Sequence, residues 1–437
     1  MMLLGNINAI PFRRRFGGGD DIPFPSIPGM IARYSALGLT NEQMAENPVW
    51  KDLTGNGHDL QMKNFAWKEG SGISDVYPGA LVFDGVDDWA GCDNLPLLPK
   101  EKGYSIIALR NWITRYDATQ YKRPLISNLG TNDEGAFLIE YRKDENVNDV
   151  TGSYNSFTDV YIDDNNPITW QTSSSYNGQI IKKGTSKSTN KLCICKTYFG
   201  QLSNYANAAI WEIVILDHDA TEEELTKIKD YFVKTYPWLF PDQAWTVVGK
   251  TNEDEDRATI ANITGNGNDL VLSNFGFAEG SDYNEEGEYA GYLVTDGVDD
   301  KIISSIFKMG NDWTVIGDWE LINTGKNDNA GIVKFDSIVI YNYNSVLINI
   351  KNGRNILIPD QNTVNAICSD GRIYSKDWKE SIYNEETEST SKNFLTIGYS
   401  GNTYTKIAFK NLAIYPTVLS REDCIKAYNY LQTLKAK

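Results

Sequence analysis

The sequence predicts an all-β chain made of two tandem β-sandwich jelly rolls, each ending in a short capping helix, behind an extended N-terminal tether. Three observations lead to this prediction. A three-part motif at 53–60, 64–71 and 81–88 recurs in the same order at 263–270, 274–281 and 293–300, which indicates that one unit was duplicated. The rest of the chain is mostly short apolar or alternating runs separated by Gly, Asn, Asp and Ser, as in sandwiches or barrels of antiparallel sheets. A capped amphipathic segment closes each unit. The expected divisions are a tether over 1–29, a first jelly roll over 30–240 and a second over 241–437.

Residues 1–29 differ in composition from everything that follows. A basic and aromatic stretch is followed by three glycines, which make a flexible joint, and then by spaced prolines, which favour an extended chain. The positive charge follows the first apolar residues instead of preceding them, so the order does not match a secretory signal. Two interpretations stay open: a disordered leader, or an anchor that inserts into a larger acidic assembly. The residues expected to make the anchor contacts are Phe12, Arg13, Arg14, Arg15 and Phe16.

The first part of the repeated motif is a glycine-rich turn. Leu-Thr-Gly-Asn-Gly-His-Asp-Leu at 53–60 recurs as Ile-Thr-Gly-Asn-Gly-Asn-Asp-Leu at 263–270. Glycine and asparagine tolerate positive φ angles, so both copies are expected to turn the chain tightly before a strand. A phosphate-binding loop would need a Lys followed by Ser or Thr and then a helix, and the sequence has neither at this point.

The last part of the motif, Asp-Gly-Val-Asp-Asp, occurs at 84–88 and 296–300. Asp-Gly predicts a hairpin between the strand at 81–83 and the strand that resumes at Trp89. Three carboxylates within five residues also supply hard oxygen ligands, although the spacing differs from that of an EF-hand loop. The sequence therefore requires no cofactor but leaves Ca²⁺ open at two groups of aspartates: Asp84, Asp87 and Asp88, and Asp296, Asp299 and Asp300.

Several segments are expected to be strands, and one helix is expected at the end of each unit. Thr221 and Glu224 form a capping box before an apolar stripe, and Ser420 begins the second helix in the same way. Both helices are expected to cover an end of their sandwich. The aromatic, proline-rich junction at 236–241 predicts that the two units pack at a preferred angle. The expected strands are 105–109, 136–141, 159–162, 209–216, 313–316, 337–341, 346–350, 394–399 and 406–415.

The composition argues against several classes of protein. A formal net charge of −17 argues against nucleic-acid binding, which needs many Lys and Arg contacts. Five Cys without metal-ligand spacing, and only two His, argue against a disulfide scaffold or a structural zinc site. Cys193 and Cys195 are expected to lie on one face of a strand as core residues. The sequence has no apolar run of about 18 residues, so no membrane insertion is expected.

The sequence shows no enzyme motif, so the chain is expected not to be an enzyme. The nearest approach to a glycosidase pattern is Glu212, but Val214 and Leu216, and not a second acid, follow at the spacing of two that a strand would need. His58 and His218 have no nucleophile motif beside them and are expected to be surface residues. Aromatic side chains in polar segments suit either sugar rings or protein contacts. The candidates for glycan contact are Tyr154, Trp170, Tyr176, Tyr343, Tyr374 and Trp378.

The order of the motifs resembles the concanavalin A-like jelly roll, in its laminin G-like branch. This resemblance implies the sandwich fold but no single ligand, because the fold carries lectins, glycosidases and structural modules. The matching segments are 52–60, 79–88 and 209–236 in the first unit, and 262–270, 291–300 and 407–431 in the second. Differences between the copies suggest that their surfaces have different functions. The equivalent positions that differ include Phe83 and Thr295, Asp52 and Asn262, and Trp67 and Phe277.

A second resemblance concerns Gly-Lys-Thr-Asn-Glu-Asp-Glu-Asp-Arg at 249–257, which is similar to proteins of phages that infect gut Bacteroides, including crAss-like phages. It implies a fibre or decoration protein on the surface of the virion, synthesised in the bacterial host cytoplasm. It also implies capsid or tail proteins as partners through the N-terminus, a homo-oligomer, and host or mucosal glycans as targets of two lectin-like domains. Two alternatives stay open: a glycan-processing enzyme on the same fold, and an architectural module without a ligand.

Overall fold

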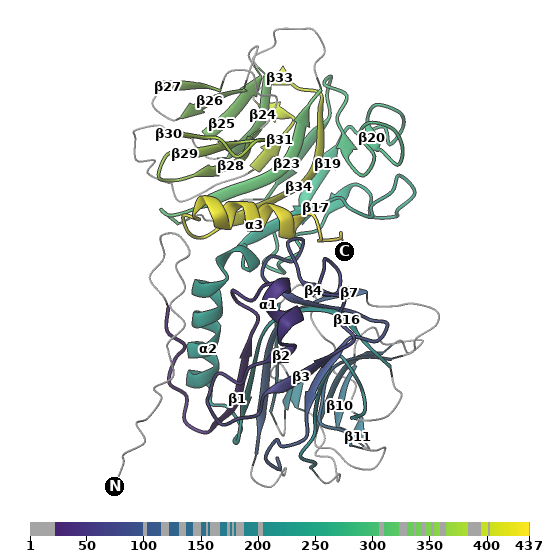
Figure 1. Cartoon of the computed structure of the whole chain (residues 1–437). Coiled ribbons are helices and arrows are strands. Elements are labelled where there is room, and N and C mark those ends of the chain that lie inside the picture. Colours follow the sequence, from purple (N-terminus) through teal and green to yellow (C-terminus); the bar gives the residue numbers. More distant parts are fainter. Residues whose placement is uncertain are drawn as a thin grey trace, which may run out of the picture.

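The computed structural model contains two β-rich bodies with one helix packed between them (Figure 1). Among the described residues, no helix is long and apolar enough to cross a membrane. The structure describes residues 22–98, 103–114, 122–130, 137–142, 150–153, 156–157, 167–172, 175–176, 179–180, 188–199, 204–305, 310–322, 330–335, 338–342, 346–350, 354–358, 364–382, 395–400 and 403–436.

The first body is a sandwich of two antiparallel sheets. One sheet has the order β14-β13-β12-β7-β16-β5-β4, and β1 also pairs with β16. Its strands are β1 (Met30–Ser35), β4 (Gly72–Ile73), β5 (Leu81–Asp84), β7 (Ser105–Thr114), β12 (Ile168–Thr172), β13 (Ser175–Tyr176), β14 (Gln179–Ile180) and β16 (Asn207–Leu216). The opposing sheet has the order β11-β10-β9-β8-β15-β6-β3-β2. Its strands are β2 (Val49–Trp50), β3 (Leu60–Lys63), β6 (Trp89–Cys92), β8 (Lys122–Ser127), β9 (Leu138–Arg142), β10 (Val150–Ser153), β11 (Ser156–Phe157) and β15 (Leu192–Ile194).

The second body repeats this architecture. One sheet has the order β20-β21-β34-β23-β28-β29-β30, and β17 also pairs with β34. Its strands are β17 (Gln243–Thr246), β20 (Asp282–Tyr283), β21 (Leu293–Val294), β23 (Thr314–Leu321), β28 (Val364–Cys368), β29 (Arg372–Ser375), β30 (Glu380–Ile382) and β34 (Ile407–Tyr415). The opposing sheet has the order β18-β19-β22-β31-β24-β25-β26-β27. Its strands are β18 (Thr259–Ile260), β19 (Leu270–Ser273), β22 (Lys301–Ser304), β24 (Ala330–Phe335), β25 (Ile338–Asn342), β26 (Val346–Ile350), β27 (Arg354–Ile358) and β31 (Leu395–Ile397), and β32 (Tyr399–Ser400) pairs separately with β33 (Thr403–Tyr404).

These sheets confirm the predicted all-β sandwich fold. Most predicted strands coincide with observed ones, and 159–162 lies outside the described residues. The glycine-rich turns are also confirmed, because Gly55 and Gly265 have φ angles of 82° and 80°. Cys193 and Cys195 are buried and unbridged, as expected of core residues. They do not share a strand face, because β15 ends at Ile194 and Cys195 has a φ of 57°.

The Asp-Gly-Val-Asp-Asp segments do not form the hairpins that the sequence predicted. β5 pairs with β16 in one sheet, whereas β6 pairs with β3 and β15 in the opposing sheet. In the second body, β21 and β22 are divided between the two sheets in the same way. Each turn therefore carries the chain across the sandwich. An Asp-Gly pair encodes a tight turn but not the sheet that the next strand joins.

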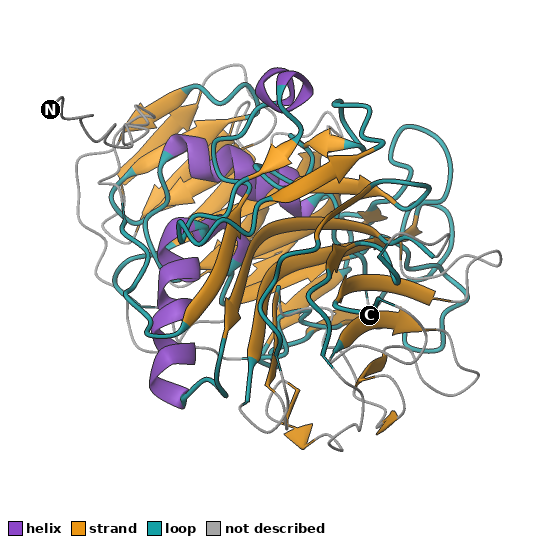
Figure 2. Cartoon of the chain, turned by 60° about the horizontal axis from the view of Figure 1, so that its bottom comes forward, coloured by secondary structure: helices purple, strands orange, loops and turns teal. Residues whose placement is uncertain are grey.

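Each of the two predicted helices lies on the outer face of a sheet, and not over an end of the sandwich as predicted (Figure 2): 222–235 on the sheet with β16, and 421–431 on the sheet with β23 and β34. Helix α2 (Glu222–Thr235) has the predicted capping box, in which Glu224 N–H donates to Thr221 Oγ1 at 3.3 Å and Thr221 N–H donates to Glu224 Oε2 at 2.9 Å. His218, expected at the surface, is 31 % exposed, and its Nε2 lies 3.1 Å from Glu224 Oε2. Helix α3 (Arg421–Leu431) is capped by Ser420. A third helix, α1 (Asn41–Glu46), was not predicted.

The junction between the bodies packs as its composition predicted. Trp238, in the short helix η2 (Pro237–Leu239), is buried in an apolar cluster that includes side chains from both bodies. The hydroxyl of Tyr415 donates to the carbonyl of Trp238 at 3.0 Å, and Lys426 Nζ lies 4.1 Å above the Trp238 ring. Burial of this kind is typical of bodies that hold one relative orientation.

Candidate functional site

The predicted anchor, Phe12 to Phe16, lies outside the described residues, so its role stays a prediction. The chain that follows it packs onto the first sandwich through Phe24. The guanidinium carbon of Arg33 lies 4.1 Å from the centre of the Phe24 ring. The ring centres of Phe24 and Tyr231 are 4.8 Å apart. The tether therefore meets the sandwich beside α2.

Arg33 also forms a buried ion pair with Glu212 on β16. Arg33 Nε lies 3.1 Å from Glu212 Oε2, and Arg33 Nη2 lies 3.1 Å from Oε1. Glu212 is fully buried, and the hydroxyl of Tyr236 donates to its Oε1 at 2.8 Å. These partners satisfy a carboxylate that would otherwise be costly to bury. The position of Glu212 is thus structural, in agreement with its rejection as a catalytic candidate.

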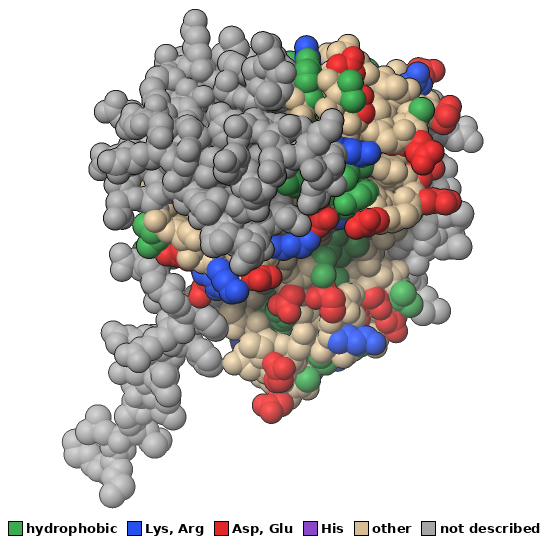
Figure 3. Space-filling model, turned by 90° about the horizontal axis from the view of Figure 1, so that it is seen from above, with side chains coloured by type: hydrophobic (Ala, Val, Ile, Leu, Met, Phe, Trp, Pro, Cys, Tyr) green, Lys and Arg blue, Asp and Glu red, His purple; other side chains and the backbone are tan. Residues whose placement is uncertain are grey.

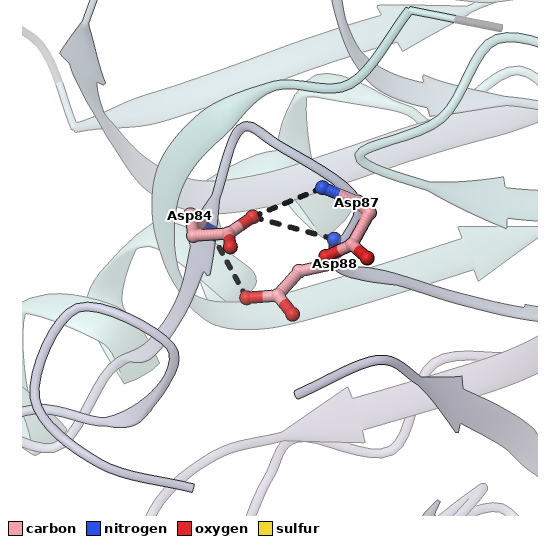
Figure 4. A group of neighbouring side chains, drawn as sticks. All are labelled: Asp84, Asp87 and Asp88. Carbon is pink, nitrogen blue, oxygen red and sulfur yellow. Dashed lines mark hydrogen bonds between the residues drawn. The ribbon is translucent and has the colours of Figure 1, made fainter. Parts of the chain in front are cut away.

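The two aspartate groups are turns held by their own carboxylates (Figure 4). Asp84 Oδ1 accepts the backbone N–H groups of Val86, Asp87 and Asp88 at 2.8, 3.2 and 3.3 Å. Asp88 Oδ2 accepts the N–H of Asp84 at 3.1 Å, so the first and last residues of the turn bind each other. The second copy repeats these bonds between Asp296 and Asp300. The carboxylates of the motif therefore close the turn between the two sheets.

Ca²⁺ at these turns stays a prediction. In each group one oxygen from each aspartate lies within 4.8 Å of the others, which is compatible with a shared cation. Ca²⁺ takes about 6–8 oxygen ligands, so the remaining ones would have to come from backbone carbonyls or water. Asp84 Oδ1 and Asp88 Oδ2 already accept backbone hydrogen bonds. The structure accounts for the aspartates as turn residues whether or not a cation binds.

Asp88 and Asp300 are expected to make stability depend on pH. Burial, the largest effect, raises the pKa of each carboxyl to about 6. The folded state therefore binds protons more tightly than the unfolded state, whose aspartates titrate near 3.9. Their contribution is complete below the unfolded pKa and is lost as the pH rises through about 6. Measured against the wild type, Asp88→Asn should become relatively more stable between pH 5 and pH 7.5.

Thermal melts at the two pH values measure this effect, with Asp87→Asn as the exposed control in the same turn. Identical pH profiles for Asp88→Asn and the wild type would contradict it. Melts with added Ca²⁺ test the cation separately. A bound cation should raise the melting temperature of the wild type at pH 7.5 and have less effect on Asp88→Asn.

The structure separates the six predicted glycan-contact aromatics. Tyr154 and Tyr343 lie outside the described residues, and only the backbone of Trp170 and Tyr176 is placed. Tyr374 is fully buried in the cluster at the junction, so it cannot offer a ring to a sugar. That part of the prediction is corrected: a polar neighbourhood in sequence did not reveal that β29 is covered. Trp378 is half-buried, and its ring lies 5.6 Å from that of Tyr428.

Tyr428 is part of a polar cluster on the outer face of β23. The hydroxyl of Tyr292 donates to Asp318 Oδ1 at 3.1 Å, and the charge of Asp318, after burial, raises the pKa of Tyr428. Lys410 Nζ lies 3.9 Å from Asp318 Oδ2 and 5.5 Å from the centre of the Tyr292 ring. Asp318 thus joins two tyrosines and one lysine from three different elements.

Glu320 extends the cluster along the same strand. It pairs with Lys376, and its side chain is 32 % exposed. Tyr289 packs edge to face on Tyr292, with ring centres 6.4 Å apart. The cluster offers half-exposed phenol rings beside carboxylates and ammonium groups. We call it the Asp318 surface; it consists of Tyr289, Tyr292, Asp318, Glu320, Lys376, Lys410 and Tyr428.

The tyrosines of this surface are hydrogen-bond donors at neutral pH. Burial, followed by the charge of Asp318, raises the pKa of Tyr292 and of Tyr428 well above the usual range. A phenol held in this state is a poor nucleophile but a stable donor. The surface therefore suits recognition of polar groups by hydrogen bonds and ring contacts.

The first sandwich uses the equivalent face for a different purpose. The ladder between β7 and β16 has a bulge at Trp211, next to the pair Leu109 and Glu212. The ladder between β23 and β34 has the same bulge at Lys410, next to the pair of Asp318 with Asn411. In the first sandwich, Leu109 and Trp211 are fully buried, and the ring of Trp211 packs against Tyr430 of α3. At this bulge the first sandwich packs against α3, whereas the second sandwich carries the Asp318 surface.

The sequence contained a signal for this surface that its analysis missed. Asp318-Trp319-Glu320 places two acids two residues apart just after the strand predicted at 313–316, in the spacing considered at Glu212. Trp319 lies in the core between the sheets, whereas the charges of Asp318 and Glu320 both act on Tyr428. The two carboxylates therefore share the outer face. What the sequence could not show is that Tyr292 and Tyr428 meet them.

Comparison with known proteins gives no family assignment. No family model and no curated protein matches the sequence. Among solved structures, the binding domain of botulinum neurotoxin serotype D is similar at 9 % identity over 91 % of this chain and 97 % of that chain, with a TM-score of 0.36. Trypanosoma rangeli sialidase in complex with sialic acid is similar at 10 % identity over 52 % of this chain, with a TM-score of 0.27. A mutant of that sialidase displaying trans-sialidase activity gives 11 % identity over 47 % of this chain and a TM-score of 0.28.

These likenesses correct one expectation. The chain was expected not to be an enzyme, and that prediction is contradicted, because enzymes are among the structures it resembles. The chain spans 33 % and 41 % of the two sialidase chains described above. At these identities and TM-scores the comparisons assign neither a ligand nor a reaction. The described structure itself is a pair of β-sandwiches in which the second carries the acidic and aromatic surface.

Proposed function

We propose that the chain is a carbohydrate-binding protein whose Asp318 surface receives the glycan. The proposal rests on the residues at the equivalent bulges of the two sandwiches, which differ in polarity. Leu109 and Trp211 are fully buried at this bulge in the first sandwich, whereas Asp318, which is 8 % exposed, and Lys410 make the same position polar in the second sandwich. An acidic, tyrosine-rich surface at a position where the other copy makes an apolar contact is a poor interface core but a good site for a polar ligand.

The chemistry of the cluster suits a sugar. Each carboxylate oxygen accepts more than one hydrogen bond, so Asp318 and Glu320 keep acceptor capacity for hydroxyl groups beyond their present partners. Hydrogen bonds to ionised groups are stronger than those between neutral groups. The rings of Tyr289 and Tyr292 meet edge to face and offer apolar surface for the C–H faces of a pyranose. Trp378 extends this aromatic surface beyond Tyr428.

A glycan array probed with the full chain tests this proposal, followed by isothermal titration calorimetry with the glycans that bind. Glycan binding by the wild type that Tyr292→Ala weakens supports the proposal. If no glycan binds, or if Tyr292→Ala changes nothing, the Asp318 surface is not a carbohydrate site.

More specifically, we propose that the protein is located on the surface of a phage particle. The similarity of 249–257 to phage proteins supports it, as does a basic tether that is separate from the acidic sandwiches. In this setting the N-terminus binds a capsid or tail protein, the chain forms a homo-oligomer, and the sandwiches face host or mucosal glycans. The protein would be made in the host cytoplasm before assembly.

Neutralising the tether is expected to release the protein from particles. In a phage that encodes the triple variant Arg13→Ala, Arg14→Ala and Arg15→Ala, purified particles should carry little or none of the protein. Arg257→Ala is the matched control, because Arg257 is an exposed arginine in the second sandwich. Particles with full occupancy by the triple variant would show that the arginines are not the anchor.

A second candidate function is glycan hydrolysis, favoured by the placement of Asp318 and Glu320 on one outer face. Two carboxylates on one strand can act as an acid and a nucleophile or base in glycosidases. Glu320 and Asp318 each have a lysine partner, an arrangement that also suits simple binding. Reducing-end assays on the polysaccharides that bind distinguish the two candidates. Hydrolysis predicts that Glu320→Gln abolishes turnover while binding persists.

A further inference from the structure

The two lysines of the Asp318 surface already pair with its carboxylates. Lys376 pairs with Glu320, and Lys410 lies within ion-pair distance of Asp318. Arg421 donates through Nε to the carbonyl of Trp378 at 3.0 Å, a neutral acceptor that does not offset the charge of the guanidinium. Lys379 is within 3.9 Å of Asp377. An anionic group on a ligand would compete with Glu320 and Asp318 for Lys376 and Lys410.

The rim adds further negative charge. Glu285, Glu286 and Glu288 are exposed in the loop between β20 and β21, just before Tyr289. The charges of Glu288 and Glu320 both act on Tyr289, after burial, to raise its pKa. In the view from above, acidic side chains spread over the described part of the surface with basic ones among them (Figure 3). An approaching carboxylate or sulfate therefore meets repulsion before it reaches the rings.

We propose that the Asp318 surface takes neutral sugars and excludes carboxylated and sulfated ones. This inference rests on the proposed function, because it names the class of ligand for the same site. Neutral hydroxyl groups donate to Asp318 and Glu320 without breaking their pairs with Lys410 and Lys376. A ligand carboxylate brings a like charge beside two carboxylates, and like charges juxtaposed at an interface cost affinity.

The experiment compares each neutral glycan that binds with its counterpart carrying a uronic acid, sialic acid or sulfate. Calorimetry with the full chain at low salt is expected to show at least tenfold weaker binding of the acidic member. The difference should shrink at high salt, because surface charges are screened. In the variant Glu285→Lys, Glu286→Lys and Glu288→Lys, affinity for the acidic member should rise while that for the neutral member changes little.

The outcomes separate this inference from the proposed function. If acidic members bind as tightly as neutral ones, and Tyr292→Ala weakens both, the site is real and the inference is wrong. If neutral members alone bind and the triple lysine variant admits the acidic ones, the inference stands. If no glycan of either class binds, the proposed function fails and the inference fails with it.

Discussion

Replacing Arg33 with leucine is expected to lower the free energy of unfolding of the first sandwich by about 3–5 kcal/mol, the usual cost of removing one partner from a buried ion pair. The change leaves Glu212 fully buried with only hydroxyl partners, Tyr231 and Tyr236. It also removes the guanidinium that packs on Phe24. Urea denaturation of the full chain, followed by tryptophan fluorescence, measures the loss as a lower midpoint.

The chain offers its own control for this prediction. In the matching ladder positions of the second sandwich, Ala244 stands for Arg33 and Asn411 stands for Glu212. The double variant Arg33→Ala with Glu212→Asn should therefore be more stable than Arg33→Leu, because no unpaired charge stays buried. An Arg33→Leu midpoint equal to that of the wild type would mean that water reaches Glu212. In that case the tether would not be held at this point.

Replacing Asp318 with asparagine is expected to weaken glycan binding by about tenfold or more. A hydrogen bond to a charged group contributes about 1.5–3 kcal/mol, and 1.4 kcal/mol corresponds to a factor of ten. Asparagine keeps the shape and one acceptor oxygen for Tyr292, so the surface should remain assembled. Calorimetry measures the affinity, and thermal melts establish that the variant is folded.

Asp312→Asn is the matched control for that experiment. Asp312 is exposed just before β23, so the same chemical change there leaves the Asp318 surface intact. Its affinity for glycans should equal that of the wild type. Equal affinities for Asp318→Asn and Asp312→Asn would place the binding site elsewhere on the chain.

Local features of the fold were predictable because they depend on neighbouring residues. The capping box of Thr221 and Glu224 and the turns at Gly55 and Gly265 formed as expected. These features involve bonds or φ angles within a few residues. Their repetition in the second unit also predicted two sandwiches of the same kind.

Features that depend on distant partners were not predictable in this way. Asp-Gly at 84–85 signals a turn, but the pairing of β6 with β3 and β15 decides that the turn crosses between sheets. Tyr374 is in a polar stretch of sequence, yet the junction buries it completely. The Asp318 surface combines β23, β34, α3 and the segment before β21. Only the spacing of Asp318 and Glu320 was visible beforehand.

The central claim is that the second sandwich binds glycan at the bulge position that the first sandwich uses for packing. The most direct measurement is a crystal structure of the chain with a neutral oligosaccharide selected on the array. The expected result is sugar density against Tyr292, Asp318 and Tyr428, with hydroxyl groups within hydrogen-bond distance of Asp318. Sugar density on the first sandwich, with the Asp318 surface free of sugar, would contradict the claim.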